Sequence, residues 1–318
     1  MYFPVAGIEV NPLVPPLVAF VISLFTSMGG VSGAFLLLPF QVSVLGFTSP
    51  SVSSTNQLFN IVAIPSGVHR YLKEGRMLWP LTWVVIIGTL PGVLVGAIVR
   101  INYLPAPKNF KLFAGLVLLY MGARLLKDLT CNTRRKGDAP TTEERFHQRE
   151  KKQSQATGGE AASCAHLSCV TVRQWTPTRI VYDFYGETFT INAVGLMALS
   201  LVVGMVGGIY GIGGGAIIAP FLVSFFGLPI YTVAGAALMG TFITSVAGVI
   251  FYQMLAPHYP GMVIAPDWLL GFLFGIGGFA GMYCGARLQK FVPAHFIKWI
   301  LVVCLLFTAG KYIWSFLF

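Results

Sequence analysis

The chain alternates long apolar segments with short polar connections, and two of the apolar segments are interrupted by glycine. Residues 10–69 contain no Lys, Arg, Asp or Glu, and neither do residues 188–266. Each run is much longer than the roughly 20 apolar residues that span a bilayer once. The pattern predicts several membrane-spanning helices, because it lacks the alternating segments of about ten residues that are typical of membrane β-barrels.

In the first half, residues 13–47 form two apolar pieces around a glycine-containing break at 27–33. Neither piece comfortably crosses a hydrocarbon core of about 30 Å alone, so we expect a helical hairpin there. Three spans are expected to follow, at 50–68, 79–99 and 110–126. The second half repeats this order, with a hairpin at 192–226 and spans at 229–254, 266–288 and 294–318.

The connection between the halves differs in composition. Residues 127–176 are polar, charged and rich in Thr, Gln and Gly, which favours a loop or a partly disordered insert. Residues 179–191 alternate around Gly186, and this pattern predicts a small β-hairpin on the membrane surface. We therefore divide the chain into a first membrane repeat (1–127), a linker (128–191) and a second membrane repeat (192–318).

An internal repeat relates the two halves. At a shift of 181 residues, seven residues of the segment 30–46 meet identical residues of 211–227. These seven are Gly30, Gly33, Pro39, Phe40, Val42, Ser43 and Gly46. At a shift of 189, Gly88, Gly92 and Gly96 meet Gly277, Gly281 and Gly285. Small residues spaced by four are typical of close helix packing in membranes.

The charge pattern decides how the repeats are oriented. Only 10% of the 318 residues are charged, and eleven of the 21 Lys and Arg lie between Arg124 and Arg179. Such a cluster is typical of cytoplasmic loops, so the net charge of +10 does not indicate a nucleic-acid partner. If each hairpin returns to its own side, the basic segments 69–76, 124–179 and 287–298 all lie in the cytosol.

This arrangement gives each half an odd number of crossings, so the two repeats are inverted. The predicted fold is an all-α polytopic membrane protein with two inverted repeats, each a glycine-broken helical hairpin plus three transmembrane helices. We expect a multi-pass protein of a bacterial inner membrane, with the central linker in the cytoplasm.

The glycine breaks carry the candidate chemistry. Seven of the twelve residues at 204–215 are glycine, which permits close backbone approach and positive φ angles. The helix that follows each break presents free N–H groups and a positive dipole end, which together favour an anion. No Lys or Arg lies in the middle of a predicted span near the breaks, so backbone N–H groups and polar side chains would hold the anion. Alternatively, the glycines only allow tight helix packing.

The candidate substrate-binding residues come from the two breaks and from the helices that follow them. Asn60 and Thr241 are equivalent at the shift of 181, which makes them the strongest side-chain candidates, although such residues often only join helices. Ser27, Gln57 and Ser245 are further donors nearby. The complete set is Gly30, Ser32, Gly33, Asn56, Asn60, Gly211, Gly213, Gly214, Gly215, Thr241 and Thr244. No catalytic residues, metal ligands or cofactor are assigned.

The sequence Gly211-Ile-Gly-Gly-Gly-Ala-Ile-Ile-Ala-Pro-Phe-Leu, with Gly227 and the Thr-Phe-Ile-Thr-Ser at 241–245, resembles the TauE/SafE family of sulfite and organosulfonate exporters. A weaker copy of the motif begins at Gly30, and it has Ser32 and Ala34 where the second copy has glycine. The long linker is a second departure from the family pattern. The resemblance covers nearly all of the chain except 128–178.

The resemblance implies a secondary transporter that exports a small sulfur-containing anion (sulfite, sulfonate or organosulfonate) by alternating access. An anion channel of the same fold and an uptake permease for a sulfonate stay open as alternatives. The expected partners are the small anionic substrate and the lipid bilayer, and a homodimer is left open. The motifs HExxH and GxSxG and paired intramembrane carboxylates are missing, so we do not expect an enzyme.

Overall fold

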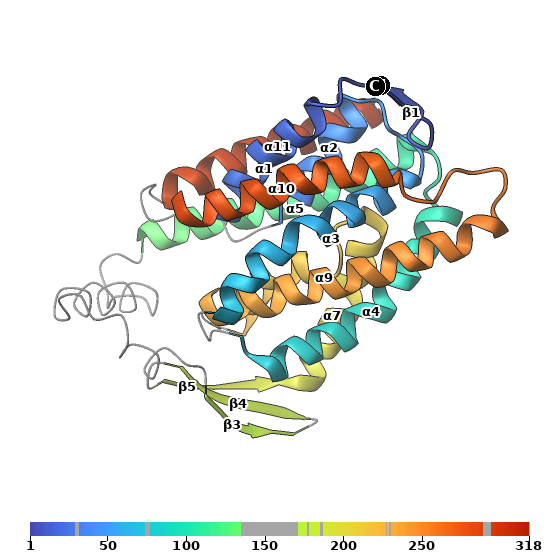
Figure 1. The fold of residues 1–318 in the computed structure, drawn as a ribbon. Coiled ribbons are helices and arrows are strands. Elements are labelled where there is room, and N and C mark those ends of the chain that lie inside the picture. The colour runs from blue at the N-terminus through green and yellow to red at the C-terminus, as the bar shows by residue number, and fades with distance from the viewer. Residues whose placement is uncertain are drawn as a thin grey trace.

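The computed structural model describes residues 1–28, 32–73, 77–134, 171–176, 178–184, 187–226, 228, 230–288 and 294–317. It confirms an all-α polytopic membrane protein, with a small sheet at one end of the helices (Figure 1). The first half contains α1 (Val14–Met28), α2 (Ala34–Ser43), α3 (Ser51–Lys73), α4 (Trp79–Asn102) and α5 (Pro107–Arg134). The second half contains α7 (Ala193–Tyr210), α8 (Gly215–Phe225), α9 (Ile230–Leu255), α10 (Trp268–Leu288) and α11 (Ala294–Leu317). The strands are β1 (Tyr2–Phe3), β2 (Ile8–Glu9), β3 (Thr171–Trp175), β4 (Arg179–Phe184) and β5 (Glu187–Asn192).

Among the described residues, six helices are long and apolar enough to cross a membrane. They are Trp79–Asn102, Pro107–Lys127, Ala193–Tyr210, Thr232–His258, Trp268–Gly285 and Trp299–Phe316. Helix α3 has a similar length but is more polar, because Ser, Thr, Asn and Gln fill most of residues 51–60. All ten of these residues are buried, so this part of α3 faces protein rather than lipid.

The helices extend further than the sequence predicts. α3 continues through the basic segment to Lys73 rather than ending at Val68. α5 continues to Arg134, which corrects the expectation of a loop from residue 127. No Gly or Pro occurs between Leu126 and Gly137, so nothing in the local sequence stops this helix.

Strands β4 and β5 form the predicted hairpin, paired antiparallel from Arg179 and Asn192 to Phe184 and Glu187. β3 pairs with the other edge of β4, which corrects the loop expected over residues 127–176. The strand contains Val, Thr and Trp, which favour β structure. This stretch is short, and it lies in a polar segment whose overall composition indicates a loop.

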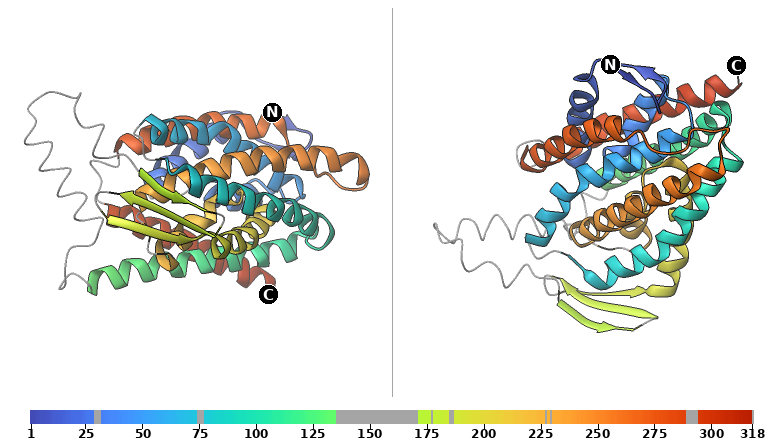
Figure 2. Two further views of the ribbon diagram at one scale, coloured as in Figure 1. Left: turned by 90° about the horizontal axis from the view of Figure 1, so that it is seen from below. Right: turned by 45° about the vertical axis from the view of Figure 1, so that its right-hand side comes forward.

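The sheet is attached to the helices by its buried face. Ile180, Tyr182 and Phe184 alternate along β4 and are buried. The hydroxyl of Tyr182 lies 3.2 Å from Thr232 Oγ1 at the start of α9, and burial raises the pKa of Tyr182 to about 12. We call this end of the helical bundle the sheet end. The opposite end, which carries β1, β2 and both chain termini, is the terminal end (Figures 1 and 2).

Two helix pairs are held together by glycines that lie against backbone. A Cβ atom on Gly92 in α4 would overlap the carbonyl oxygen of Leu201 in α7. A Cβ atom on Gly281 in α10 would overlap the carbonyl oxygen of Phe20 in α1 in the same way. Phe20 and Leu201 are 181 residues apart, and Gly92 and Gly281 are 189 apart, so both contacts follow the two sequence shifts.

The contacts on either side give the directions of these helices. Gly96 lies against Met205, and Gly285 lies against Leu24, which are again equivalent pairs. Residue numbers therefore rise together in both pairs, so α4 runs parallel to α7, and α1 runs parallel to α10. The long helices α3 and α9 run in opposite directions, because Gly67 contacts Leu238 while Gln57 contacts Gly248.

Candidate functional site

Helix α7 ends in a sharp break, which we call the second elbow (residues 211–214). Gly211 and Gly213 have φ angles of +84° and +76°, which side-chain-bearing residues rarely adopt. The N–H groups of Gly211 and Ile212 both donate to the Gly207 carbonyl, at 2.9 and 3.0 Å, and so close the helix. Helix α8 then starts at Gly215, directly against Ala237 of α9.

The glycines of this region fall into two groups. Gly204 and Gly208 remain helical, and a Cβ atom on Gly208 would lie 2.5 Å from the Val93 carbonyl oxygen in α4. These two glycines allow tight helix packing, which is the plainer of the two interpretations of the sequence. Gly211 and Gly213 form the break itself, where the backbone conformation requires glycine.

We call the connection between α1 and α2 (residues 29–33) the first elbow, and the structure describes its residues 32 and 33. Gly30, a candidate from the sequence, lies outside the described residues. A Cβ atom on Gly33 would lie 2.7 Å from Ser23 Oγ, so this glycine permits close contact with α1. Ser32 Oγ accepts a hydrogen bond from the Ala34 N–H at 3.3 Å, at the start of α2.

Asn60 of α3 joins the two elbows. Its side-chain oxygen accepts a hydrogen bond from Ser32 Oγ at 2.8 Å. Its amide nitrogen donates to the Ile212 carbonyl at 3.0 Å and to Ser245 Oγ at 3.4 Å. Asn60 is fully buried, so segments more than 150 residues apart meet on one side chain in the interior of the bundle.

Asn56, one helical turn earlier, makes a second connection of this kind. Its amide nitrogen donates to the carbonyls of Ala34, at 3.1 Å, and Gly211, at 3.0 Å. Its side-chain oxygen accepts from Gln41 Nε2 at 3.3 Å. Both asparagines therefore bind carbonyl oxygens of the second elbow, while the N–H groups of that elbow point elsewhere.

Helix α9 supplies the other side of the site. The N–H of Gly214 donates to Thr244 Oγ1 at 3.1 Å, and that hydroxyl donates to the Gly240 carbonyl at 2.7 Å. Thr241 Oγ1 donates to the Ala237 carbonyl at 2.8 Å. A Cβ atom on Gly215 would overlap the Ala237 carbonyl oxygen, so the start of α8 lies directly on α9.

The described candidates thus come together in one buried cluster between α3, α9 and the two elbows. The cluster presents neutral hydroxyl and amide groups and the first turns of two short helices. The side chains of Ser32, Asn56, Asn60, Thr241 and Thr244 are at most 2% exposed. Such a site can hold a small anion through N–H and O–H donors without a local countercharge.

Gln57 differs from its neighbours on α3. It is fully buried, yet neither atom of its side-chain amide has a hydrogen-bond partner among the described residues. The amide lies against Gly248 of α9, where a Cβ atom would be 2.7 Å from Gln57 Cδ. Sequence reasoning treated Gln57 only as a nearby donor and left it out of the candidate set.

Arg100 is a guanidinium that the expectation about the middle of the spans does not cover, because it lies in the last turn of α4. α4 extends to Asn102, so Arg100 falls inside the helix, and it is fully buried. Its Nε donates to Ser53 Oγ at 3.4 Å, and Ser53 Oγ donates to the Ile209 carbonyl at 3.2 Å, next to the second elbow. The apolar residues on both sides of Arg100 are the sequence signal for its burial.

Comparisons with known proteins give one match. A protein-family model described as "Sulfite exporter TauE/SafE" matches residues 16–312, which is nearly the whole chain. No curated protein and no solved structure matches the chain significantly.

Proposed function

The chain belongs to the sulfite exporter TauE/SafE family, and we propose that it exports a small sulfur oxyanion or sulfonate by alternating access. The family is one of membrane transporters and not of enzymes, so the chain is a membrane transporter of the sulfite and sulfonate class. The observation that carries the finer proposal is the meeting of both elbows on Asn60, because it provides one buried polar site between two halves of the chain.

We propose that the two halves are inverted repeats. The paired contacts of Gly92 with Leu201 and of Gly281 with Phe20 support this, because each joins one half to the other at equivalent positions. The antiparallel packing of α3 on α9, which are themselves equivalent, supports it further. Transporters built from inverted repeats bind substrate near the midplane, where broken helices from both repeats meet.

In the proposed bound state, the anion lies between the first turns of α2 and α8. The Gly214 N–H, which now donates to Thr244 Oγ1, would donate to the anion, and the Thr244 hydroxyl would turn toward it. Ser32 and Thr241 supply further O–H donors, and Gly213 and Gly215 keep the surroundings free of side chains. Asn56 and Asn60 hold the two elbows together, so a displacement of one elbow is passed to the other.

We place the linker and the sheet end in the cytoplasm, because eleven of the 21 basic residues lie between Arg124 and Arg179. Export of an anion then moves negative charge toward the positive side of the membrane. A membrane potential of 100 mV contributes about 2.3 kcal/mol per charge to that movement. Export can therefore run on the potential without an intramembrane proton relay.

Flux from proteoliposomes tests the proposal. Purified protein is reconstituted with sulfite or methanesulfonate inside, and efflux is followed under a potential set by potassium and valinomycin. The proposal expects saturable efflux that depends on the potential and is inhibited by competing sulfonates. Flux that does not saturate indicates a channel, and efflux no faster than from protein-free liposomes contradicts the proposal.

A further inference from the structure

Arg100 carries a buried charge that no carboxylate among the described residues neutralises. Its side chain is fully buried, and the one ion pair within the described part of the chain joins Arg173 and Asp183, on the sheet. Arg100 donates to the Leu104 carbonyl and to Ser53 Oγ, while its Nη2 has no partner. Burial of a charge is costly unless it is paired, so this guanidinium favours an anion beside it.

The groups around Arg100 suit an anion. The ring of Phe110 covers one face of the guanidinium, 3.8 Å from Arg100 Cζ, and closes that face to ligands. Tyr252 of α9 packs in one buried cluster with Ala97 and Ile101, which flank Arg100 along α4, and its fully buried hydroxyl also has no partner in the described structure. Arg100 Nη2 and the Tyr252 hydroxyl are therefore two unused donors in the same buried region between α4 and α9.

The unused donors continue toward the elbows. Ser53, Gln57 and Asn60 lie on one face of α3, at the helical spacing of four and three residues, over about 10 Å. On the facing side, Gln57 lies against Gly248 of α9. Tyr252 follows Gly248 by four residues, which is about one helical turn. The unpartnered amide of Gln57 therefore lies between Arg100 and Asn60, along the α3–α9 interface.

We propose that Arg100, Tyr252 and Gln57 form a second anion site, on the terminal side of the elbows, that holds the transported anion on its way past them. This inference rests on the proposed transport function and adds a site that the glycine motif does not contain. The Nη2 group of Arg100 keeps its N–H donors for an oxyanion such as sulfite, and the delocalised positive charge strengthens those hydrogen bonds beyond what a neutral side chain provides. The neutral elbow site would bind the anion weakly, and Arg100 would keep it in the pathway.

The test compares Arg100→Gln, Arg100→Lys and Tyr252→Phe with the wild type and with Arg173→Gln, a control that removes an exposed arginine from the sheet. Binding of sodium sulfite to purified protein is measured by thermal shift in a sodium gluconate buffer, with sodium chloride titrated separately. Initial efflux rates are measured in proteoliposomes over a range of sulfite concentrations.

We expect Arg100→Gln to weaken sulfite binding about tenfold or more, as for the loss of a charge-assisted hydrogen-bond partner. Tyr252→Phe should weaken it less, and Arg173→Gln should leave it unchanged. If Arg100→Gln does not fold, Arg100→Lys and Tyr252→Phe decide the matter, because both retain most of the side-chain volume.

The outcomes separate the second site from the transport function. If the wild type exports sulfite but these variants bind sulfite as tightly as the wild type, the second site alone is overturned. The second site is also overturned if sodium chloride raises the unfolding temperature as much as sulfite does and sulfite does not compete with chloride. Arg100 would then hold a fixed chloride ion. A wild type without sulfite efflux overturns the proposed function instead.

Discussion

The hydroxyl of Ser32 donates to the side-chain oxygen of Asn60 at 2.8 Å, and this bond ties the first elbow to the helix that also holds the second elbow. The other end of the Asn60 amide donates to the Ile212 carbonyl at 3.0 Å. The side-chain oxygen of Asn60 therefore binds the first repeat, and its amide nitrogen binds the second. The bond explains why an asparagine, with both functions, stands at this position of α3.

Asn60→Ala should strongly reduce flux and lower stability, because it leaves Ser32 Oγ and the Ile212 carbonyl without their partner in a buried site. Each buried group left unpaired costs about 1–3 kcal/mol. Ser66→Ala on the same helix is the matched control, because Ser66 bonds only to the Ala63 carbonyl of its own helix. Thermal unfolding of the purified proteins and efflux from proteoliposomes measure the two effects. Equal stability and flux in the two variants would show that the bridge between the elbows is unimportant.

Gly214→Ala tests whether the start of α8 needs an open approach to α4. The φ and ψ angles of Gly214, −68° and −35°, suit any residue, so the effect cannot come from backbone strain. The new methyl group would instead overlap Thr89 Cβ. We expect a large loss of efflux, partly restored in the double variant Gly214→Ala/Thr89→Gly.

Gly310→Ala is the control for this substitution, because a Cβ atom on Gly310 would meet nothing within 4 Å. That variant should keep wild-type efflux and wild-type thermal stability. Full efflux in Gly214→Ala alone would remove Gly214 from the proposed site.

Much of this fold could be predicted because its signals are local. The apolar runs predict the helices, alternation around Gly186 predicts the hairpin of β4 and β5, and the two sequence shifts pair the glycines that the structure places in equivalent contacts. The shift of 181 residues also selected Asn60, which the structure places between the elbows.

The rest depends on tertiary contacts that no local pattern records. The burial of Arg100 depends on packing against the ring of Phe110, from the next helix α5, and against α9, where Tyr252 lies 152 residues later in the sequence. The sequence predicted N–H groups at the second elbow as the main feature, whereas Asn56 and Asn60 bind its carbonyl oxygens. Which glycines pack helices and which break them depends on φ, and composition does not encode φ.

Gly92→Ala and Gly281→Ala should have similar effects, because the two glycines occupy equivalent contacts in the proposed repeats. In each, the new methyl group would overlap a carbonyl oxygen of the neighbouring helix, Leu201 or Phe20. A packed helix pair cannot admit the group without moving apart, so we expect both variants to lower the unfolding temperature by a similar amount. A large loss in one variant and none in the other would contradict the proposed equivalence.

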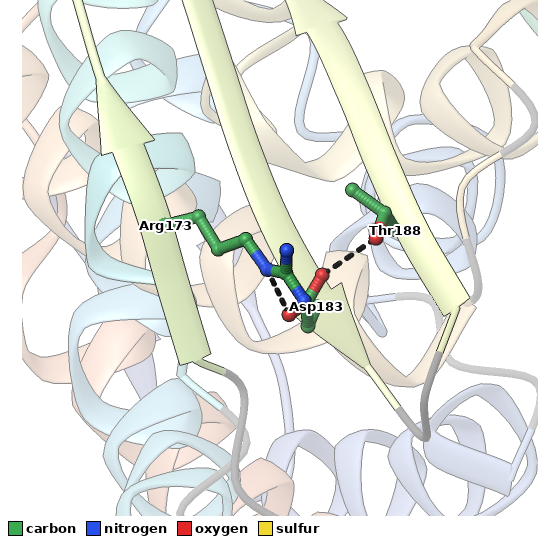
Figure 3. Close-up of polar contacts among 3 residues, drawn as sticks. All are labelled: Arg173, Asp183 and Thr188. Carbon is green, nitrogen blue, oxygen red and sulfur yellow. Dashed lines mark hydrogen bonds and ion pairs between the residues drawn. The ribbon is translucent and has the colours of Figure 1, made fainter.

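Asp183 gives the sheet a weak dependence on pH. Hydrogen bonds from Thr188 and Arg173 hold the pKa of Asp183 below its ordinary value (Figure 3). Because the folded pKa is the lower one, the stabilisation is complete above the unfolded value of about 3.9 and is lost as the pH falls through the folded value. We expect Asp183→Asn to remove this dependence in unfolding curves between about pH 5 and 2. Since the carboxylate is partly exposed on the sheet and does not belong to the proposed anion sites, efflux at neutral pH should not change.

The orientation of the repeats can be tested by cysteine labelling. Helix α3 ends at Lys73 at the sheet end, whereas the equivalent helix α9 ends at the terminal end, near Pro260. In a variant without the five native cysteines, Lys73→Cys and Pro260→Cys should react with a membrane-impermeant maleimide from opposite faces of the membrane. Gln174→Cys on β3 should react from the same face as Lys73→Cys, and in intact cells both should be labelled only after permeabilisation. Labelling of Lys73→Cys and Pro260→Cys from the same face would mean that the repeats are parallel, and the proposed meeting of two elbows from opposite sides would then fail.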